Sequence, residues 1–331
     1  MAENPTKSLN PSVDAAVQRT ASLALLLATV FWGCGFTWAK AGGSAVYRAA
    51  NLPDGSSFGP VFLLAWRFTV GGLVWLLLFP AARRGWTLAG VMRSIGVGAP
   101  LALGLILQHI GLDLTSEAVS AFLTSLTILF VPLFLTFAMR KPPRPLLWVG
   151  VALATLGIWL MTGATPSGFG KGELLGLAGA VAFSAYILSV NAAAVHDTPW
   201  RMTAGQFVVV AMTCFIFCAL VPGGAGTFRP GAMAHILWQR DVWLNVLLLA
   251  AFPTIAAFGL LTHFQPRIDP TRAALLYLIE PVVAASYAAI AAHHLIDRRA
   301  IAGAALILIA NALVELLSSR QARREQPIVL D

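Results

Sequence analysis

Long apolar runs, separated by short polar stretches, extend along the chain from Ala21 to Leu317. A helix that crosses the hydrocarbon core of a bilayer needs about 20 mostly apolar residues. The runs that meet this requirement are residues 21–41, 59–80, 92–111, 117–138, 145–163, 172–193, 203–221, 242–262, 271–292 and 300–317. The pattern therefore predicts an all-α polytopic membrane protein with ten transmembrane helices.

Composition agrees with this class and excludes others. The chain is 58% hydrophobic and 11% charged, whereas a soluble globular protein carries about 25% charged residues. Its net charge of +8 arises from basic residues in the short loops, as membrane topology requires. Basic stripes with interleaved aromatic residues are not found, so we expect a lipid bilayer as partner and no nucleic acid.

The Lys and Arg residues also predict the orientation. With the N-terminus inside, about twice as many of them lie in the expected inner segments as in the outer ones. Residues 1–20 lack the basic start of a signal peptide, so we interpret the first run as a retained span. We therefore expect a multi-pass protein of the inner (plasma) membrane with both termini cytoplasmic.

Three segments recur after about 150 residues. "VFWGCGFTWAK" (30–40) matches "VAFSAYILSVN" (181–191), and "GVALATLG" (150–157) matches "GAALILIA" (303–310). "TSLTILFVPLF" (124–134) matches "AALLYLIEPVV" (273–283), which places Pro132 on Pro281 and Val131 on Glu280. The common spacing predicts two five-helix repeats, 21–163 and 172–317, between tails 1–20 and 318–331.

An odd number of spans in each repeat means that the second copy enters the membrane from the opposite side. Such a 5+5 inverted repeat is the architecture of secondary transporters, whose substrate site lies near the midplane between the copies. An intramembrane hydrolase or transferase would need a motif such as H-E-x-x-H or an acid pair, and neither occurs. A receptor or membrane scaffold, the other alternative, would not require a duplication.

The same segments resemble the EamA-type branch of the drug/metabolite transporter superfamily. The resemblance rests on "FWGCGFTWAK", "FLLAWRF", "LILQHIGLDLTSEAVSAFLTSLTILFVPLF", "FQPRIDPTRAALLYLIEPVVA" and "GAALILIA", in this order. It implies a ten-helix exporter or permease for small metabolites such as amino acids or drugs, without a bound cofactor. The chain departs from the family where "MRKPP" and "AHHLIDR" replace a Gly-Glu pair, and where the first outer loop (43–59) looks expanded.

Glu280 is a carboxylate within the ninth span. A charge at bilayer mid-depth costs at least ~2.5–3.5 kcal/mol, so it should face the interior and find a partner. Tyr277 shares its helical face, and Pro281 should kink the helix there, as Pro132 should in the fourth span. We interpret Glu280 as a cavity carboxylate that could also carry a coupling proton. The alternative is a structural ion pair.

Arg67, within the second span, is the obvious partner for Glu280. Its guanidinium stays charged and needs an acceptor. It could bind Glu280 in one state and a substrate carboxylate in another. The alternative is that Arg67 extends to the outer headgroups.

Further candidates are polar or aromatic residues within the spans. Ser120, Thr124 and Thr127 form a polar stripe on the face of Val131, although such hydroxyls also bond to their own helix. Trp32 and Tyr186, with Phe36 and Phe183, could stack on a substrate or simply pack. The remaining candidates, each also explicable as an interfacial or packing residue, are Gln108, His109, Gln206 and His263.

Metal binding is not expected, because "HHLID" (293–297) offers too few ligands for a closed site. The three cysteines read as packing residues. The combined prediction is a secondary transporter, with an exporter favoured, that moves small organic metabolites by alternating access. Protons are the candidate coupling ion, and we expect a monomer or a weak homodimer.

Overall fold

The computed structural model describes residues 11–138, 170–268 and 273–292, apart from 54, 222, 223 and 275, together with scattered positions of 149–160 and 298–313. Every regular element in these ranges is helical. Seven helical runs are long and apolar enough to cross a membrane, and an eighth, Tyr277–Ala291, is shorter. The expected spans 145–163 and 300–317 lie largely outside the described residues, so the full count of ten stays a prediction.

The first half contains five described α-helices. They are α1 (Pro11–Ala50), α2 (Phe58–Leu78), α3 (Leu88–Asp113), α4 (Glu117–Ser125) and α5 (Thr127–Ala138), with a 3-10 turn η1 (Pro80–Arg83) after α2. The expected loop 43–59 is wrong in its first part, because α1 continues to Ala50. No strong helix breaker interrupts "AVYRAA", and the helix ends where Asn51 adopts a positive φ of 52°.

The second half is built from shorter pieces. They are α7 (Lys171–Ala193), α8 (Pro199–Leu220), α9 (Gly224–Thr227), α10 (Pro230–Trp238), α11 (Arg240–Leu249), the π-helix η2 (Ala250–Ala256), α12 (Ala257–Phe264), the 3-10 turns η3 (Gln265–Arg267) and η4 (Tyr277–Ile279), and α14 (Glu280–Ala292). The expected eighth span is thus one helical run, α11–η2–α12, with a π-helix in its middle.

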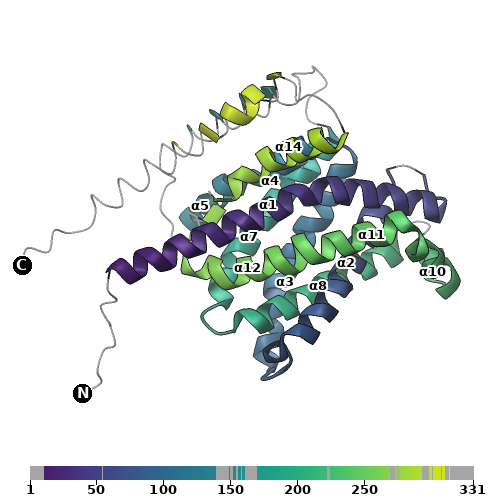
Figure 1. Cartoon of the computed structure of the whole chain (residues 1–331), viewed down its shortest axis with the longest axis horizontal. Coiled ribbons are helices and arrows are strands. Elements are labelled where there is room, and N and C mark those ends of the chain that lie inside the picture. Colours follow the sequence, from purple (N-terminus) through teal and green to yellow (C-terminus); the bar gives the residue numbers. More distant parts are fainter. Residues whose placement is uncertain are drawn as a thin grey trace, which may run out of the picture.

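The helix contacts that one half makes with the other are repeated when equivalent helices of the two halves are interchanged. Helix α1 packs between α14 on one side and α11–α12 on the other (Figure 1). Helix α7 packs in the same way against α4–α5 and against α3. Exchanging α1 with α7, α3 with α11–α12, and α4–α5 with α14 converts one set of contacts into the other. The helices α2 and α8, equivalent in this scheme, pack against each other.

Helices α2 and α8 run in opposite directions where they meet. The Trp75 indole, near the end of α2, donates to the carbonyl of Trp200 at the start of α8, over 3.0 Å. Further along, the Phe68 and Phe207 rings lie 5.5 Å apart. The two phenylalanines occupy the same place in "AWRF" (65–68) and "AGQF" (204–207). Equivalent residues of the two halves therefore meet at this contact, as expected near the axis that relates the halves. In the same alignment Gln206 is the counterpart of Arg67.

The register expected for the fourth and ninth spans is corrected. Helix α5 restarts at Thr127 after a turn at Leu126, and α14 starts at Glu280 after the 3-10 turn η4. The helix restart is the feature that repeats, so Thr127 is the counterpart of Glu280, and Val131 is not. The proline match misled the sequence comparison because Pro281 occupies the first turn of α14, where its missing N–H costs no hydrogen bond, while Pro132 lies inside α5.

Glycines allow α3 and α7 to approach closely. A Cβ at Gly111 would lie 2.8 Å from the carbonyl oxygen of Gly172 and 3.2 Å from the backbone nitrogen of Gly176. Backbone atoms of a packed helix have little freedom to move aside. Gly96, on the same helix α3, has no atom within 4 Å of its Cβ position.

This difference predicts opposite effects of one substitution on one helix. Gly111→Ala should destabilise the protein by about 1–3 kcal/mol through overpacking. Gly96→Ala should be neutral or stabilise it by up to about 1 kcal/mol, since alanine is the better helix former. Thermal unfolding of both variants in one detergent tests the pair. Equal melting temperatures would contradict the close contact of α3 with α7.

Candidate functional site

A central cavity lies between the two halves and measures about 80 Å³. Both halves line it. The first half contributes residues of α1, α2, α3, α4 and α5, and the second half contributes residues of α7, η2, α12, η4 and α14. The candidate residues that line it are Glu280, Arg67, Tyr277, Trp32, Tyr186, Thr124, Thr127, Gln108 and His109. Because about 10–15 Å³ of such space holds one water molecule, this conformation accommodates several waters or one small chemical group.

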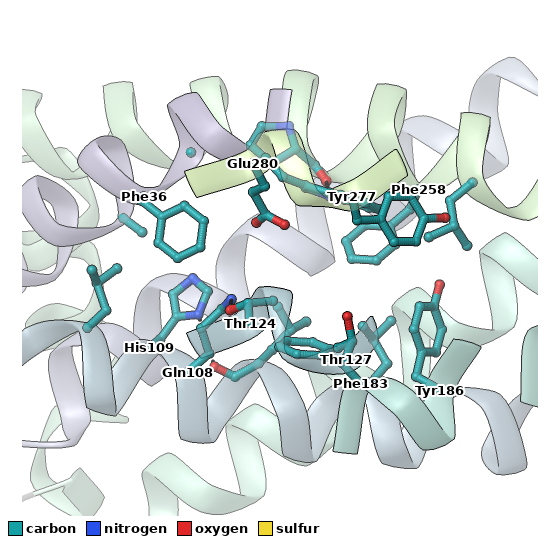
Figure 2. A pocket seen from close by; sticks show the side chains of 18 of the residues that line it. Phe36, Gln108, His109, Thr124, Thr127, Phe183, Tyr186, Phe258, Tyr277 and Glu280 are labelled. Atoms are coloured by element: carbon teal, nitrogen blue, oxygen red, sulfur yellow. Dashed lines mark hydrogen bonds between the residues drawn. The ribbon is translucent and has the colours of Figure 1, made fainter. Parts of the chain in front are cut away.

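Aromatic rings form one end of the cavity (Figure 2). The Trp32 ring lies 5.3 Å from the Phe258 ring and 5.5 Å from the Tyr277 ring. The centroids of the Tyr186 and Phe258 rings lie 6.2 Å apart, with the two rings edge to face. Rings at these separations offer both faces and edges to an occupant, so this end suits an apolar, aromatic or cationic group.

The π-helix η2 places two of its residues against the first half. The carbonyl of Pro253 accepts a hydrogen bond from the Trp32 indole over 3.0 Å. The next residue, the fully buried Thr254, accepts one from Nε of Arg67 over 3.0 Å. A π-helix inside an α-helix commonly marks a functional site. Here it turns a carbonyl and a hydroxyl toward α1 and α2.

Arg67 is held by Thr254 and His109 rather than by Glu280. Its Nη1 lies 3.4 Å from Nε2 of His109, and its side chain is only 3% exposed, so it does not extend to the headgroups. None of the ion pairs between described residues joins Arg67 to Glu280. In this conformation, therefore, the expected ion pair is not formed.

The tautomer of His109 follows from its two partners. Its Nδ1 lies 2.9 Å from the carbonyl oxygen of Leu105, which is only an acceptor. Nδ1 therefore carries the proton, and Nε2 is free to accept from the guanidinium of Arg67. His109 acts as a neutral acceptor that orients Arg67 beside the cavity.

Glu280 is 5% exposed, and Figure 2 shows its carboxylate pointing into the cavity toward the wall that carries Gln108, His109 and Thr124. Within the described part of the chain, this carboxylate has neither a hydrogen bond nor an ion pair. A buried carboxylate without a partner is costly. Its orientation indicates that water, a proton or a cationic group compensates it in the membrane.

The wall opposite Glu280 is polar. Gln108 donates to the Thr124 hydroxyl over 2.7 Å, and that hydroxyl donates to the carbonyl of Ser120 over 3.0 Å. The Thr124 hydroxyl thus bonds to its own helix and also faces the cavity. Bonding within the helix and a place in the cavity wall, the two alternatives for the polar stripe, are therefore both true of this residue. Thr127 completes this wall.

Three candidates lie outside the cavity. Ser120 is buried in α4 behind it, and its hydroxyl lacks a partner among the described residues. Gln206 supports the wall, because its Oε1 accepts from the Tyr186 hydroxyl over 3.0 Å. His263 lies 2.9 Å from the Arg267 guanidinium and next to Trp200, away from the cavity.

Sequence reasoning missed Pro253, Thr254 and Phe258. The available signal was a proline inside each of two equivalent runs, Pro100 in α3 and Pro253 in η2. The segment "HHLID" lies outside the described residues.

The hydrogen bond between Arg67 and Thr254 predicts a stability effect. Thr254→Val keeps the shape but leaves a charged donor unpaired, so it should cost about 1–3 kcal/mol. In an Arg67→Met background the same change should cost little.

Glu280→Gln should be neutral or stabilising, since it removes no ion pair. Unfolding of the single and double variants measures these couplings, and the ion-pair interpretation would be supported instead if Arg67→Met removed a large cost of Glu280→Gln.

Comparisons with known proteins agree with this architecture. A curated protein from Archaeoglobus fulgidus, named an uncharacterized transporter, is 25% identical to this chain over 248 residues, 75% of either chain. One solved crystal structure has a TM-score of 0.62 over 92% of this chain and 99% of its own, at 22% identity, and this likeness shows the fold. The model of the EamA-like transporter family matches residues 19–163 and again residues 170–316. The family and the named relative indicate a multi-pass membrane transporter rather than an enzyme, and we conclude that this chain belongs to the EamA-like transporter family.

Proposed function

We propose that this protein is a secondary transporter of the inner membrane that exports small organic metabolites by alternating access. The observation that carries the proposal is a cavity lined by helices of both repeats, with a buried carboxylate aimed into it. A site at the seam between repeats becomes accessible from alternate sides when one repeat rocks against the other.

The proposal includes two inverted halves of five spans each, approximately 21–163 and 172–317. Support comes from the antiparallel crossing of α2 and α8 and from the exchange of contacts between the halves. The excess of Lys and Arg in the loops on the side of the N-terminus supports cytoplasmic termini. A single chain with two repeats forms the cavity alone, which favours a monomer or a weak homodimer.

The chemistry of the cavity favours a substrate with an ammonium group and an apolar or aromatic part. Glu280 supplies a carboxylate without a partner, and Trp32, Tyr277 and Phe258 supply rings close to it. Carboxylates and aromatic faces together bind ammonium groups. Arg67 keeps further N–H donors beyond those used by Thr254 and His109, so a substrate carboxylate also has a partner. Amino acids, related amines and small cationic drugs fit this description.

Proton coupling follows from the same carboxylate. Of the described residues that line the cavity, Glu280 alone carries an acidic group. A proton and a substrate ammonium compete for the same oxygens, so the two cannot bind there together. Exchange of one for the other across the membrane would drive export with the proton gradient.

The test is transport by purified protein in proteoliposomes with a panel of amino acids, amines and drugs, with and without a pH gradient. For any substrate that moves, the gradient should accelerate wild-type transport. Glu280→Gln should remove that acceleration and lower substrate affinity by about tenfold or more, since a lost charged contact of this kind exceeds about 1.4 kcal/mol.

Asp241→Asn provides the matched control, because it makes the same chemical change at an exposed site remote from the cavity. It should behave as wild type. If Glu280→Gln and Asp241→Asn respond alike to the gradient, Glu280 does not carry the coupling. If no member of the panel moves, the substrate class is wrong.

A further inference from the structure

Two hydrogen-bonded clusters lie at opposite ends of the cavity and occupy equivalent places in the two repeats. We name them the Lys40 rim (Lys40, Thr115 and Glu117) and the Gln265 rim (Asn191, Gln265 and Tyr277). We propose that these rims are the two gates of the transporter and that they open alternately. The inference rests on the alternating access proposed above.

The Lys40 rim ties α1 to the connection between α3 and α4. Nζ of Lys40 donates to the carbonyl of Thr115 over 2.6 Å and lies 3.7 Å from the Glu117 carboxylate. The Thr115 hydroxyl donates to Glu173 at the start of α7 over 3.1 Å. The preceding residue of α1, Ala39, lines the cavity. Through Glu173 the rim therefore connects the two halves next to the cavity.

The Gln265 rim ties α7 to the connection between α12 and η4. Nε2 of Gln265 donates to Oδ1 of Asn191 over 2.8 Å and to the carbonyl of Ile187 over 3.1 Å. The Tyr277 hydroxyl donates to Oε1 of Gln265 over 2.8 Å. Ile187 and Tyr277 both line the cavity. This rim thus continues directly from the cavity wall.

Lys40 and Asn191 are the equivalent residues that generate the two rims. They are the last residues of the matched segments "VFWGCGFTWAK" and "VAFSAYILSVN". Each lies on the first helix of its half and binds the connection that follows the third span of that half. The same position on the first helix of each half, Lys40 in one and Asn191 in the other, therefore closes one end of the cavity.

The rims lie far apart along α7. Glu173 at the Lys40 rim and Asn191 at the Gln265 rim are separated by 18 residues of one helix. At about 1.5 Å per residue this is about 27 Å, close to the thickness of a hydrocarbon core. The cavity lies between them, since Ala39 and Ile187, next to one rim and the other, both line it.

The two rims are not closed to the same extent. Lys40 and Glu117 keep 32% and 23% of their side-chain surface exposed, whereas Gln265 is fully buried. In the Gln265 rim Asn191 is partly exposed, but Gln265 and Tyr277 are buried, so the Lys40 rim is the more open of the two. An occupant that binds the Tyr277 hydroxyl competes with Gln265 for it, which links occupation of the cavity to release of the Gln265 rim.

Thiol accessibility tests the gates without any substrate. In a background that lacks Cys34, Cys214 and Cys218, single reporters Ala39→Cys and Leu261→Cys place a thiol in the cavity near each rim. A membrane-impermeant maleimide is added to one side of sealed vesicles at a time. Gln265→Ala should raise labelling of Leu261→Cys severalfold from the side of the Gln265 rim and lower labelling of Ala39→Cys from the other side. Lys40→Ala should do the reverse.

Matched controls are Gln239→Ala and Lys171→Ala, which make the same changes at exposed positions outside both rims. They should leave both rates of labelling unchanged. If Gln265→Ala does not fold, Tyr277→Phe and Asn191→Ala break the same chain of hydrogen bonds at the next links. Equal increases at both reporters would show general loosening, and no change at either would show that the rims do not gate. Both results overturn the proposal.

This readout separates the gates from the proposed function. If the reporters respond reciprocally while no panel compound is transported, the gates stand and the proposed substrate class fails. If transport occurs but Gln265→Ala and Lys40→Ala alter neither labelling nor rate, the transporter stands and the gates fail.

Discussion

Two opposite charges that do not pair inside a membrane protein are the constraint on which the site depends. Arg67 and Glu280 are both almost fully buried, and each would cost several kcal/mol if left without compensation. Arg67 is compensated by protein groups, and one of them, Thr254, reaches it through the π-helix η2. Glu280 has no such partner within the described chain. The irregular backbone of η2 therefore stabilises Arg67, whereas Glu280 remains available to an occupant of the cavity.

The exchange between halves explains where the charges lie, and divergence between the halves explains why they differ. Thr127 is the counterpart of Glu280, and Gln206 is the counterpart of Arg67. Each half thus contributes one charge and one neutral polar residue at equivalent positions. A symmetric cavity would bind a polar molecule in either of two orientations. With the acid in one half and the base in the other, the proposed substrate with an ammonium group would be directed toward α14.

The sequence predicted the helical class, the repeat and most of the polar cavity residues, because apolar run length and buried charge are local signals. It failed where backbone geometry decides. The proline match placed Val131 opposite Glu280, yet the shared feature is a helix restart that no residue type encodes. Thr254 was missed because a threonine in an apolar run is uninformative until the π-helix turns it toward Arg67. His263 was chosen for its chemistry, and its neighbours Arg267 and Trp200 place it away from the cavity.

In the proposed gating, the strengths of the hydrogen bonds in the two rims set the free-energy scale of opening. The partly exposed pair of Lys40 and Glu117 is worth about 0–1 kcal/mol. Each buried neutral hydrogen bond of Gln265 contributes about 0.5–1.5 kcal/mol, and the structure shows three. Moving a two-state equilibrium from 1:99 to 99:1 takes about 5.5 kcal/mol. Together the three bonds of the Gln265 rim amount to about 1.5–4.5 kcal/mol, so in the proposed gating they would account for a substantial part of that energy.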